Sequence, residues 1–188
     1  DNEMGKLWLD TDAEMRLTDT AGEDWYVTKS TSTGGSGNVI FPAIQVPSAD
    51  VNTLDDYEEG TWTPVIGGTG GESGQTYDIQ IGLYTKIGRL VTVFCQVRLT
   101  AKGTITGQVV IKGLPFATAT NSRGSSALIW VDLATNWVNL VAAPNPTDTY
   151  MAVLGTSVAA ANNITTLATA DIGNTSRFDV AVSYLSSD

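Results

Sequence analysis

The stretch NTLDDYEEGTWTP, residues 52–64, holds side chains that could do chemistry, because it crowds four carboxylates around one tyrosine: Asp55, Asp56, Glu58 and Glu59. Two carboxylates about 5 to 9.5 Å apart are enough for a glycosidase, and carboxylate oxygens are ligands that calcium prefers. The competing interpretation is a junction between two parts of the molecule, with its charges in water. The rest of the sequence has to decide between these interpretations.

Most hydrolytic mechanisms are excluded because the chain contains no histidine, so neither a Ser-His-Asp nor a Cys-His arrangement can form. The single cysteine, Cys95, alternates with polar residues between Val93 and Val97, where burial would raise its thiol pKa instead of activating it. A glycosidase needs its two acids on opposite walls of a rigid cleft, and the four acids share one short peptide. The acids of the remaining chain are scattered: Glu72, Asp78, Asp132, Asp148, Asp171, Asp179 and Asp188. We expect the protein to have no catalytic activity and to bind no cofactor.

Calcium binding is a stronger alternative to the junction than catalysis is. The run DTDAE, residues 10–14, has the acid spacing that opens an EF-hand loop, but Met15 stands where that loop needs glycine and Ala21 where it needs glutamate. The EF-hand is therefore rejected and no metal site is assigned. A looser oxygen-ligand site, shared around a trimer axis by Asp55 or Asp56, stays open.

The junction is the interpretation that the acidic stretch favours. Leu54 and Tyr57 can pack inward at a spacing of one turn while the acids stay in water. Gly60 then lets the chain change direction into a strand led by Trp62. The predicted junction residues are Leu54, Asp55, Asp56, Tyr57, Glu58, Glu59, Gly60 and Trp62.

Charge divides the chain at about the same place. The 188 residues have a formal net charge of -10, and 42% of them are hydrophobic, which suits one medium domain with attachments. Residues 1–60 hold 13 acids and 3 bases, whereas the remainder holds 7 of each. This excess of acid argues against binding to nucleic acid through its phosphates. No run approaches the ~18 consecutive apolar residues of a membrane helix, so we expect no membrane insertion.

The body of the chain alternates with the period of two that strands have. Apolar positions alternate along residues 89–100 and again along a matching last strand at residues 178–184. Further strands are predicted at residues 108–112, 127–133, 137–143 and 150–154. No segment carries a sustained helical stripe. We predict an all-β fold, with an antiparallel β-sandwich or jelly-roll over residues 54–188.

The N-terminal part differs in pattern. GKLWLDTD and EDWYVTKS suit an attachment hairpin over residues 1–30, in which Trp8 and Trp25 could cover one another. An isolated hairpin is unstable in water, so this arm needs a partner surface. Residues 31–53 are predicted to be a Gly/Ser linker followed by an extended segment, whose prolines exclude it from a central strand.

These residues carry a resemblance. FPAIQVPSADVNTLDDYEEGTWTPVI, YTKIGRLVTVFCQVRL, KGLPFAT and DIGNTSRFDVAVSY resemble the C-terminal domain of many bacteriophage tail-fibre and virion-fibre proteins, here the LDDYEEGTWTP family. GKLWLDTD followed by DWYV is similar to a short attachment module of such proteins. The resemblance implies a homotrimer at the virion surface, with residues 1–53 bound to other virion proteins and the C-terminal domain projecting. GGTGGESGQ and VNLVAAPNPTDTY depart from the pattern, so the target is not carried over.

Two tryptophans predict a contact surface on the body. If residues 127–133 and 137–143 form a hairpin with a loop of even length, Trp130 pairs with Asn139 and Asp132 with Trp137. All four would then lie on the outer side of their strands, with apolar rows on the inner side. Aromatic platforms beside polar groups suit a host-surface glycan or a contact between subunits.

Three functions follow as hypotheses. The first is a tail-fibre protein whose anchored arm holds a trimeric body against the host surface. The alternative is a capsid-decorating head fibre or cement protein with the same fold, and the third is a polysaccharide depolymerase. The sequence does not separate tail from head, since both need an anchor, a trimer and a β-domain.

Overall fold

The chain forms two compact units, Asp1–Ala43 and Ile44–Asp188. The computed structural model describes residues 57–122, 124–158 and 163–187, and of the first 56 residues only the backbone of three short strands. The residues Leu54, Asp55 and Asp56 of the predicted junction therefore lie outside the described part, as does the acidic run 10–14.

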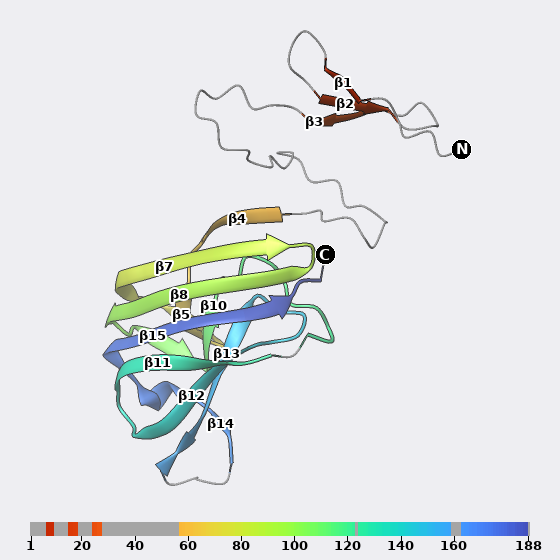
Figure 1. Cartoon of the computed structure of the whole chain (residues 1–188). Helices are drawn as coiled ribbons and strands as arrows, with labels where there is room; N and C mark the ends of the chain where they lie inside the picture. Colours follow the sequence, from red (N-terminus) through yellow and green to blue (C-terminus); the bar gives the residue numbers. More distant parts are fainter. Residues whose placement is uncertain are drawn as a thin grey trace. The chain divides into compact units, whose positions relative to one another are not determined.

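The N-terminal unit contains a three-stranded antiparallel sheet, drawn in red in Figure 1, made of β1 (Leu7–Leu9), β2 (Met15–Thr18) and β3 (Asp24–Val27). The two segments predicted to pair with each other are β1 and β3, but both pair with β2, which lies between them. The prediction that these two segments form a two-stranded hairpin is therefore wrong, because they are the outer strands of a three-stranded sheet. The reason lies in the run MRLT of β2, which alternates apolar and polar residues and so supplies a third strand.

The register of this sheet also separates the two tryptophans. Trp8 is the partner of Arg16, whereas Trp25 is the partner of Leu17, the next residue of β2. Trp8 and Trp25 are therefore not cross-strand partners of one another. Their role as an anchor stays a prediction.

The body is all-β, and its strands alternate as the sequence predicts. Its elements are β4 (Tyr57–Trp62), β5 (Val65–Gly68), β6 (Gly71–Ser73), β7 (Thr76–Ile87), β8 (Leu90–Ala101), β9 (Thr104–Thr106), β10 (Val109–Lys112), β11 (Ser126–Leu133), β12 (Trp137–Pro144), β13 (Tyr150–Ser157), β14 (Thr165–Thr166), the 3₁₀ turn η2 (Thr169–Asp171) and β15 (Ile172–Leu185). No helix of the described residues is long and apolar enough to span a membrane.

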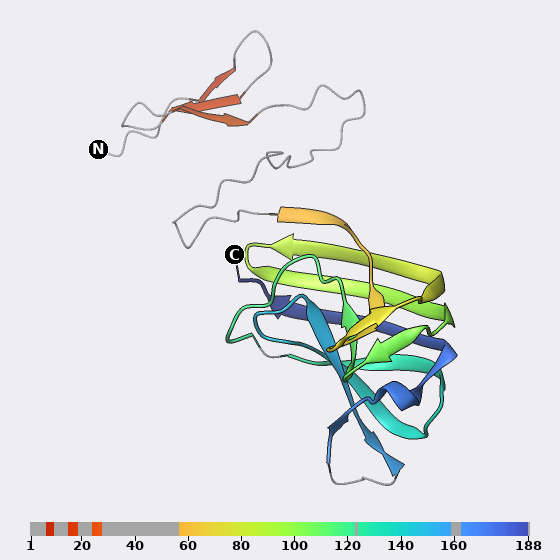
Figure 2. The same ribbon diagram turned by 180° about the vertical axis from the view of Figure 1, so that it is seen from behind.

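One ten-stranded antiparallel sheet makes up most of the body. Its strand order is β4-β7-β8-β15-β11-β12-β13-β10-β5, with β14 paired to β13, while β6 and β9 form a separate pair. The two strands at the ends of this order, β4 and β5, are joined by only Thr63 and Pro64. The sheet is therefore curled until its ends meet. In Figure 1 the strands β7, β8 and β15 are nearest the viewer, and Figure 2, the view from behind, shows the side with β5, β10 and β13.

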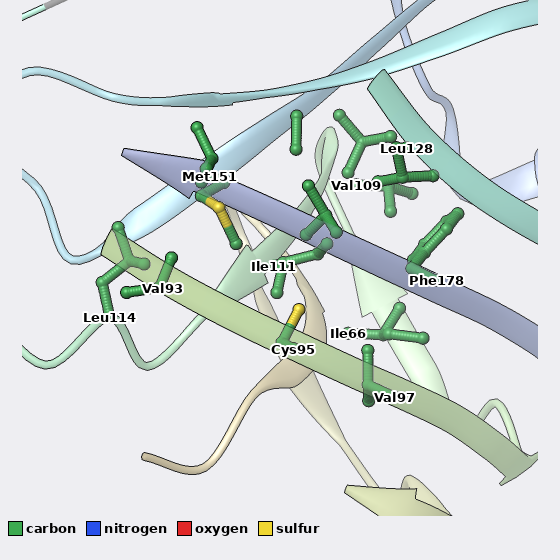
Figure 3. Close-up of a cluster of buried hydrophobic side chains, with 14 of the residues drawn as sticks. Ile66, Val93, Cys95, Val97, Val109, Ile111, Leu114, Leu128, Met151 and Phe178 are labelled. Carbon is green, nitrogen blue, oxygen red and sulfur yellow. The ribbon is translucent and has the colours of Figure 1, made fainter. Parts of the chain in front are cut away.

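A single apolar core lies between the two halves of the curled sheet. The inward residues of β8 are almost completely buried: Val91, Val93, Cys95, Val97 and Leu99. In β15 the buried residues are Phe178, Val180, Val182 and Tyr184. Ile66 of β5, Ile111 of β10 and Met151 of β13 meet them from the other half (Figure 3). The alternation predicted for β8 and β15 is confirmed, and the curled antiparallel sheet is consistent with a β-sandwich.

Candidate functional site

The described part of the predicted junction, Tyr57–Trp62, forms a strand at the end of the strand order. Tyr57–Trp62 is β4, and it pairs with β7 along its whole length, from Tyr57 opposite Ile87 to Trp62 opposite Gly82. The change of direction predicted at Gly60 is therefore wrong, since the residue lies within the strand. Glycine is usually unfavourable there, so its presence needs a local reason.

That reason is the ring of Tyr84. Gly60 and Tyr84 are cross-strand partners, and a Cβ atom on Gly60 would lie 2.8 Å from Cε1 of the tyrosine. Two residues further along β4 the roles are exchanged, because the indole of Trp62 lies against Gly82 of β7. A glycine faces an aromatic ring in both pairs, an arrangement that compensates for glycine in a strand. The motif EEGTW is thus explained by the packing of β4 on β7.

The two described acids of the junction lie on opposite faces of β4. The hydroxyl of Tyr84 donates to the carboxylate of Glu58, whose partner in β7 is Lys86. Glu59, on the other face, accepts from the Tyr57 hydroxyl at 3.1 Å. Because successive residues of a strand point to opposite sides, these carboxylates cannot act together on one substrate.

Glu58 belongs to a cluster of polar and aromatic groups that we call the motif cluster: Glu58, Tyr84, Lys86, Phe116 and Tyr184. The rings of Tyr84 and Phe116 meet edge to face, with centroids 5.4 Å apart. The ammonium of Lys86, which is only 3% exposed, lies 5.2 Å from the Phe116 centroid. The Tyr184 hydroxyl donates to the Phe116 carbonyl at 3.0 Å. The Glu58 carboxylate, as a hydrogen-bond acceptor and a negative charge, together with burial raises the pKa of Tyr84 to about 12.

The predicted tryptophan patch is not on the outside of the body. Trp130 and Trp137 are both half-buried and pack against the core. In β11 the inner face carries Leu128, which is 3% exposed, whereas Ile129 on the outer face is 67% exposed. The predicted inner and outer faces of β11 are therefore reversed over residues 128–131, whereas Leu133, beyond a bulge, packs against the core as predicted.

The register of the hairpin explains the reversal. β11 pairs with β12 at Ser126 opposite Ala142, one residue away from the predicted pairing of Trp130 with Asn139. A shift of one residue sends every side chain to the other face. In β12 the inward positions of Leu140 and Ala142 agree with the prediction. A bulge between Trp137 and Asn139 then turns Trp137 inward and leaves Val138 exposed.

The two polar residues of the predicted patch, Asp132 and Asn139, make hydrogen bonds within the body. Asp132 lies at a bulge of β11 with φ of 55°, and its carbonyl accepts from the Ser176 hydroxyl at 2.8 Å. The side-chain oxygen of Asn139 accepts from the Thr156 amide at 3.1 Å. The four predicted residues are not brought together as one surface. Whether any of them touches a receptor or a subunit stays a prediction.

Cys95 is the core residue that the sequence predicts. It is completely buried, and burial raises the pKa of its thiol to about 12. Among the described residues, no three side chains of the metal-ligating types come together.

The sequence analysis missed a broad apolar surface on the outside of the sheet. We call it the outer face, and its large side chains, between 43% and 49% exposed, come from β7, β8 and β15: Ile81, Leu83, Ile87, Leu90, Phe94 and Leu185. The signal was present in β7, because its aliphatic residues Ile79, Ile81, Leu83 and Ile87 all stand at odd positions while the even positions are mostly polar. An apolar face of a strand needs a partner.

Charged residues close one end of the outer face. The guanidinium of Arg98 makes a bidentate pair with Asp78, with Nε 2.8 Å from the carboxylate. Arg177 of the neighbouring strand pairs in the same way with Asp179, at 2.9 and 2.6 Å. The hydrogen bonds from Arg98 hold the pKa of Asp78 below its usual value. The charges at this end of the outer face are thus paired within the chain.

A pocket of about 330 Å³ lies beside the outer face. It is lined by Arg89, Leu185 and Ser187 and by the loop residues Ala119, Thr120, Asn121 and Ser122. Nε and a terminal nitrogen of Arg89 donate to the Ser186 carbonyl at 3.2 and 3.0 Å. The Ser122 hydroxyl accepts from the Leu185 amide at 2.9 Å. These groups hold the end of β15 in place.

Comparisons of the chain with protein-family models, with curated proteins and with solved structures found no match.

Proposed function

We propose that the chain is a fibre-type structural protein of a bacteriophage virion, without catalytic activity. Residues 1–53 would bind other virion proteins, and residues 54–188 would form a homotrimeric β-sandwich that projects from the particle surface. As part of the tail, this body would contact the host surface, with a cell-surface glycan as the partner.

The observation that carries the proposal is the meeting of the resembling sequence runs at the motif cluster. The run that ends in EEGTWTPVI supplies Glu58, and YTKIGRLVTVFCQVRL supplies Tyr84 and Lys86. Phe116 comes from KGLPFAT and Tyr184 from the last run. The hydrogen bonds, ring contact and cation–π contact given above join these groups.

The same runs are neighbours in the sheet. They contribute β4, the end of β7, β8 and β15, which are consecutive in the strand order. Segments far apart in the chain thus form one structural unit, as expected if the resemblance reflects a shared domain. The division of the chain into a small N-terminal unit and an all-β body supports the roles of anchor and projecting domain.

Particle imaging tests the proposal directly. Antibody against the body should label the tails of intact virions, and particles whose protein lacks residues 1–53 should lose the label while the truncated protein stays folded. Labelling of the head would replace the tail assignment by capsid decoration. Release of reducing sugar from host polysaccharide by the purified protein would show a depolymerase instead.

Assembly is a second test. Light scattering should give a mass three times the 19.8 kDa of the chain. A monomer at micromolar concentration would contradict the homotrimer.

A further inference from the structure

We propose that the outer face of β7, β8 and β15 is the surface through which copies of this chain contact each other. The inference rests on the proposed function, because it assigns the contact of the homotrimer to a particular set of residues. Its occupant is a second copy of the same body.

The apolar residues of the outer face are neighbours across strands and not isolated. Leu83 of β7 is the partner of Phe94 of β8, and Phe94 is the partner of Ala181 of β15. Nearer the end of β15, a second row runs from Tyr57 through Ile87 and Leu90 to Leu185. Paired residues of adjacent strands lie on the same face. These rows therefore form two apolar bands on one face, separated by the row that contains Thr85, Thr92 and Ser183.

This surface has little to offer a polar ligand. Between the two apolar rows, the hydroxyls of Thr92 and Ser183 lie 2.8 Å apart and bond to each other. The only charged side chain of that row is Glu59, which accepts from Tyr57. A sugar would need free donors and acceptors here, whereas an apolar protein surface needs only a matching shape.

The size of the outer face suits a stable contact. With strands about 4.8 Å apart and a rise of about 3.4 Å per residue, the three strands of the outer face over seven residues cover roughly 14 Å by 24 Å, and the flanking strands β4 and β11 extend this to roughly 24 Å by 24 Å, or about 600 Å² before side-chain relief is added. A standard interface buries about 800 Å² on each partner. Phe94 lies in the middle, where an exposed aromatic ring is the usual anchor of an interface.

Charge favours an identical copy as the occupant. All of the acidic excess lies in the first 60 residues, whereas residues 61–188, which form most of the body, hold seven acids and seven bases. The charged end of the outer face is neutralised within each chain by the Arg98–Asp78 and Arg177–Asp179 pairs. Glu59 lies on β4, at the end of the strand order, so its carboxylate can stay in water at the rim while the charges that meet are already paired.

The test measures the mass of the full chain by light scattering for the wild type and for Phe94→Glu. The matched control is Val138→Glu, which adds the same charge to an apolar residue of β12 that is 63% exposed and lies off the outer face. We expect three chains for the wild type and the control, and one folded chain for Phe94→Glu, with unchanged near-UV circular dichroism. A Phe94→Glu protein that stays trimeric would overturn the assignment of the surface and leave the proposed function standing.

A second variant and a measurement in salt complete the test. If Phe94→Glu does not fold, Leu83→Glu on β7, whose side chain is 49% exposed, is measured in its place with the same expectations. The wild-type mass should also persist in about 1 M salt, which screens ion pairs and strengthens apolar contacts. Dissociation in salt would assign the contact to charges and contradict the inference. A monomeric wild type would contradict the homotrimer itself.

Discussion

The indole of Trp62 lies against Gly82, its cross-strand partner, and the indole nitrogen donates to the neighbouring Leu83 carbonyl at 3.2 Å. Tyr84 lies against Gly60 in the same way, so β4 and β7 exchange a ring and a glycine in both directions. β4 is at one end of the strand order, and among the described strands only β7 pairs with it. These two pairs are therefore the contacts that fix the first strand of the body.

Gly82→Ala should destabilise the body because the new methyl group has no room. A Cβ atom at this position would overlap the Trp62 carbonyl oxygen and lie 2.8 Å from its ring. Backbone atoms cannot move aside cheaply, so we expect a loss of about 1–3 kcal/mol in the free energy of unfolding. Chemical denaturation followed by tryptophan fluorescence measures it.

Gly173→Ala is the matched control for this prediction. The nearest atom to a Cβ on Gly173, the Asp132 carbonyl oxygen, is 3.5 Å away, an ordinary contact distance. We expect a change within about 0.5 kcal/mol there. Equal losses at the two glycines would show that the close approach of Trp62 does not matter.

The sequence was sufficient for strands that have one apolar face. In β8 and β15 the buried residues other than Ser176 are apolar, and the exposed residues between them are mostly polar, so the inner face could be predicted. In β11 it could not, because Leu128 and Trp130 compete with the equally apolar Ile129 and Val131. Periodicity cannot choose between two apolar faces, and the choice is made by the register with neighbouring strands.

The candidate sites depended even more on tertiary contacts. Gly60 reads as a turn in the sequence, and only the ring of Tyr84, 24 residues away, explains it inside a strand. The outer face joins residues from three strands, so no local pattern displays it. Cys95 was predictable, since its whole neighbourhood alternates.

Alkaline pH should weaken the fold through Tyr84. Its ordinary pKa of 10.0 is raised to about 12 in the folded state by the Glu58 hydrogen bond, burial and the charge of that carboxylate. The folded protein then holds this proton more tightly than the unfolded chain does, so the stabilising effect is complete below pH 10 and is lost as the pH rises towards 12. Denaturation midpoints measured from pH 9 upward should fall over this range.

Tyr84→Phe tests the assignment. The variant should lose about 1 kcal/mol near neutral pH, for one hydrogen bond, and its stability should fall less steeply above pH 10. Tyr77 and Cys95, whose pKa values are also raised to about 12, leave a residual slope. Parallel curves for the wild type and the variant would show that Tyr84 does not contribute.

Cys95 should be unreactive until the protein unfolds. The thiol is completely buried and its pKa is raised by that burial, so both access and the thiolate fraction are low. A colourimetric thiol reagent at pH 8 should detect no thiol in buffer and one per chain in denaturant. In Thr135→Cys, with the new thiol in the exposed loop between β11 and β12, one thiol should react at once. Equal rates for Cys95 and position 135 would contradict the buried site.

Trp62 and Trp137 form a matched pair for the last prediction. Both indoles pack against or within the core, but the nitrogen of Trp62 donates to the Leu83 carbonyl, whereas the buried nitrogen of Trp137 has no acceptor among the described residues. Replacement by phenylalanine removes the same volume at each site. A buried donor without a partner costs about 1–3 kcal/mol, so Trp137→Phe recovers that cost and Trp62→Phe does not.

We therefore expect Trp62→Phe to be less stable than Trp137→Phe by about 1–3 kcal/mol in chemical denaturation. Trp137→Phe itself should lie within about 1 kcal/mol of the wild type, because the relieved donor offsets the small cavity left by the lost ring. A loss at Trp137 as large as that at Trp62 would mean that the Trp137 nitrogen is satisfied in solution. The bulge that turns Trp137 inward would then serve a hydrogen bond and not only the filling of the core.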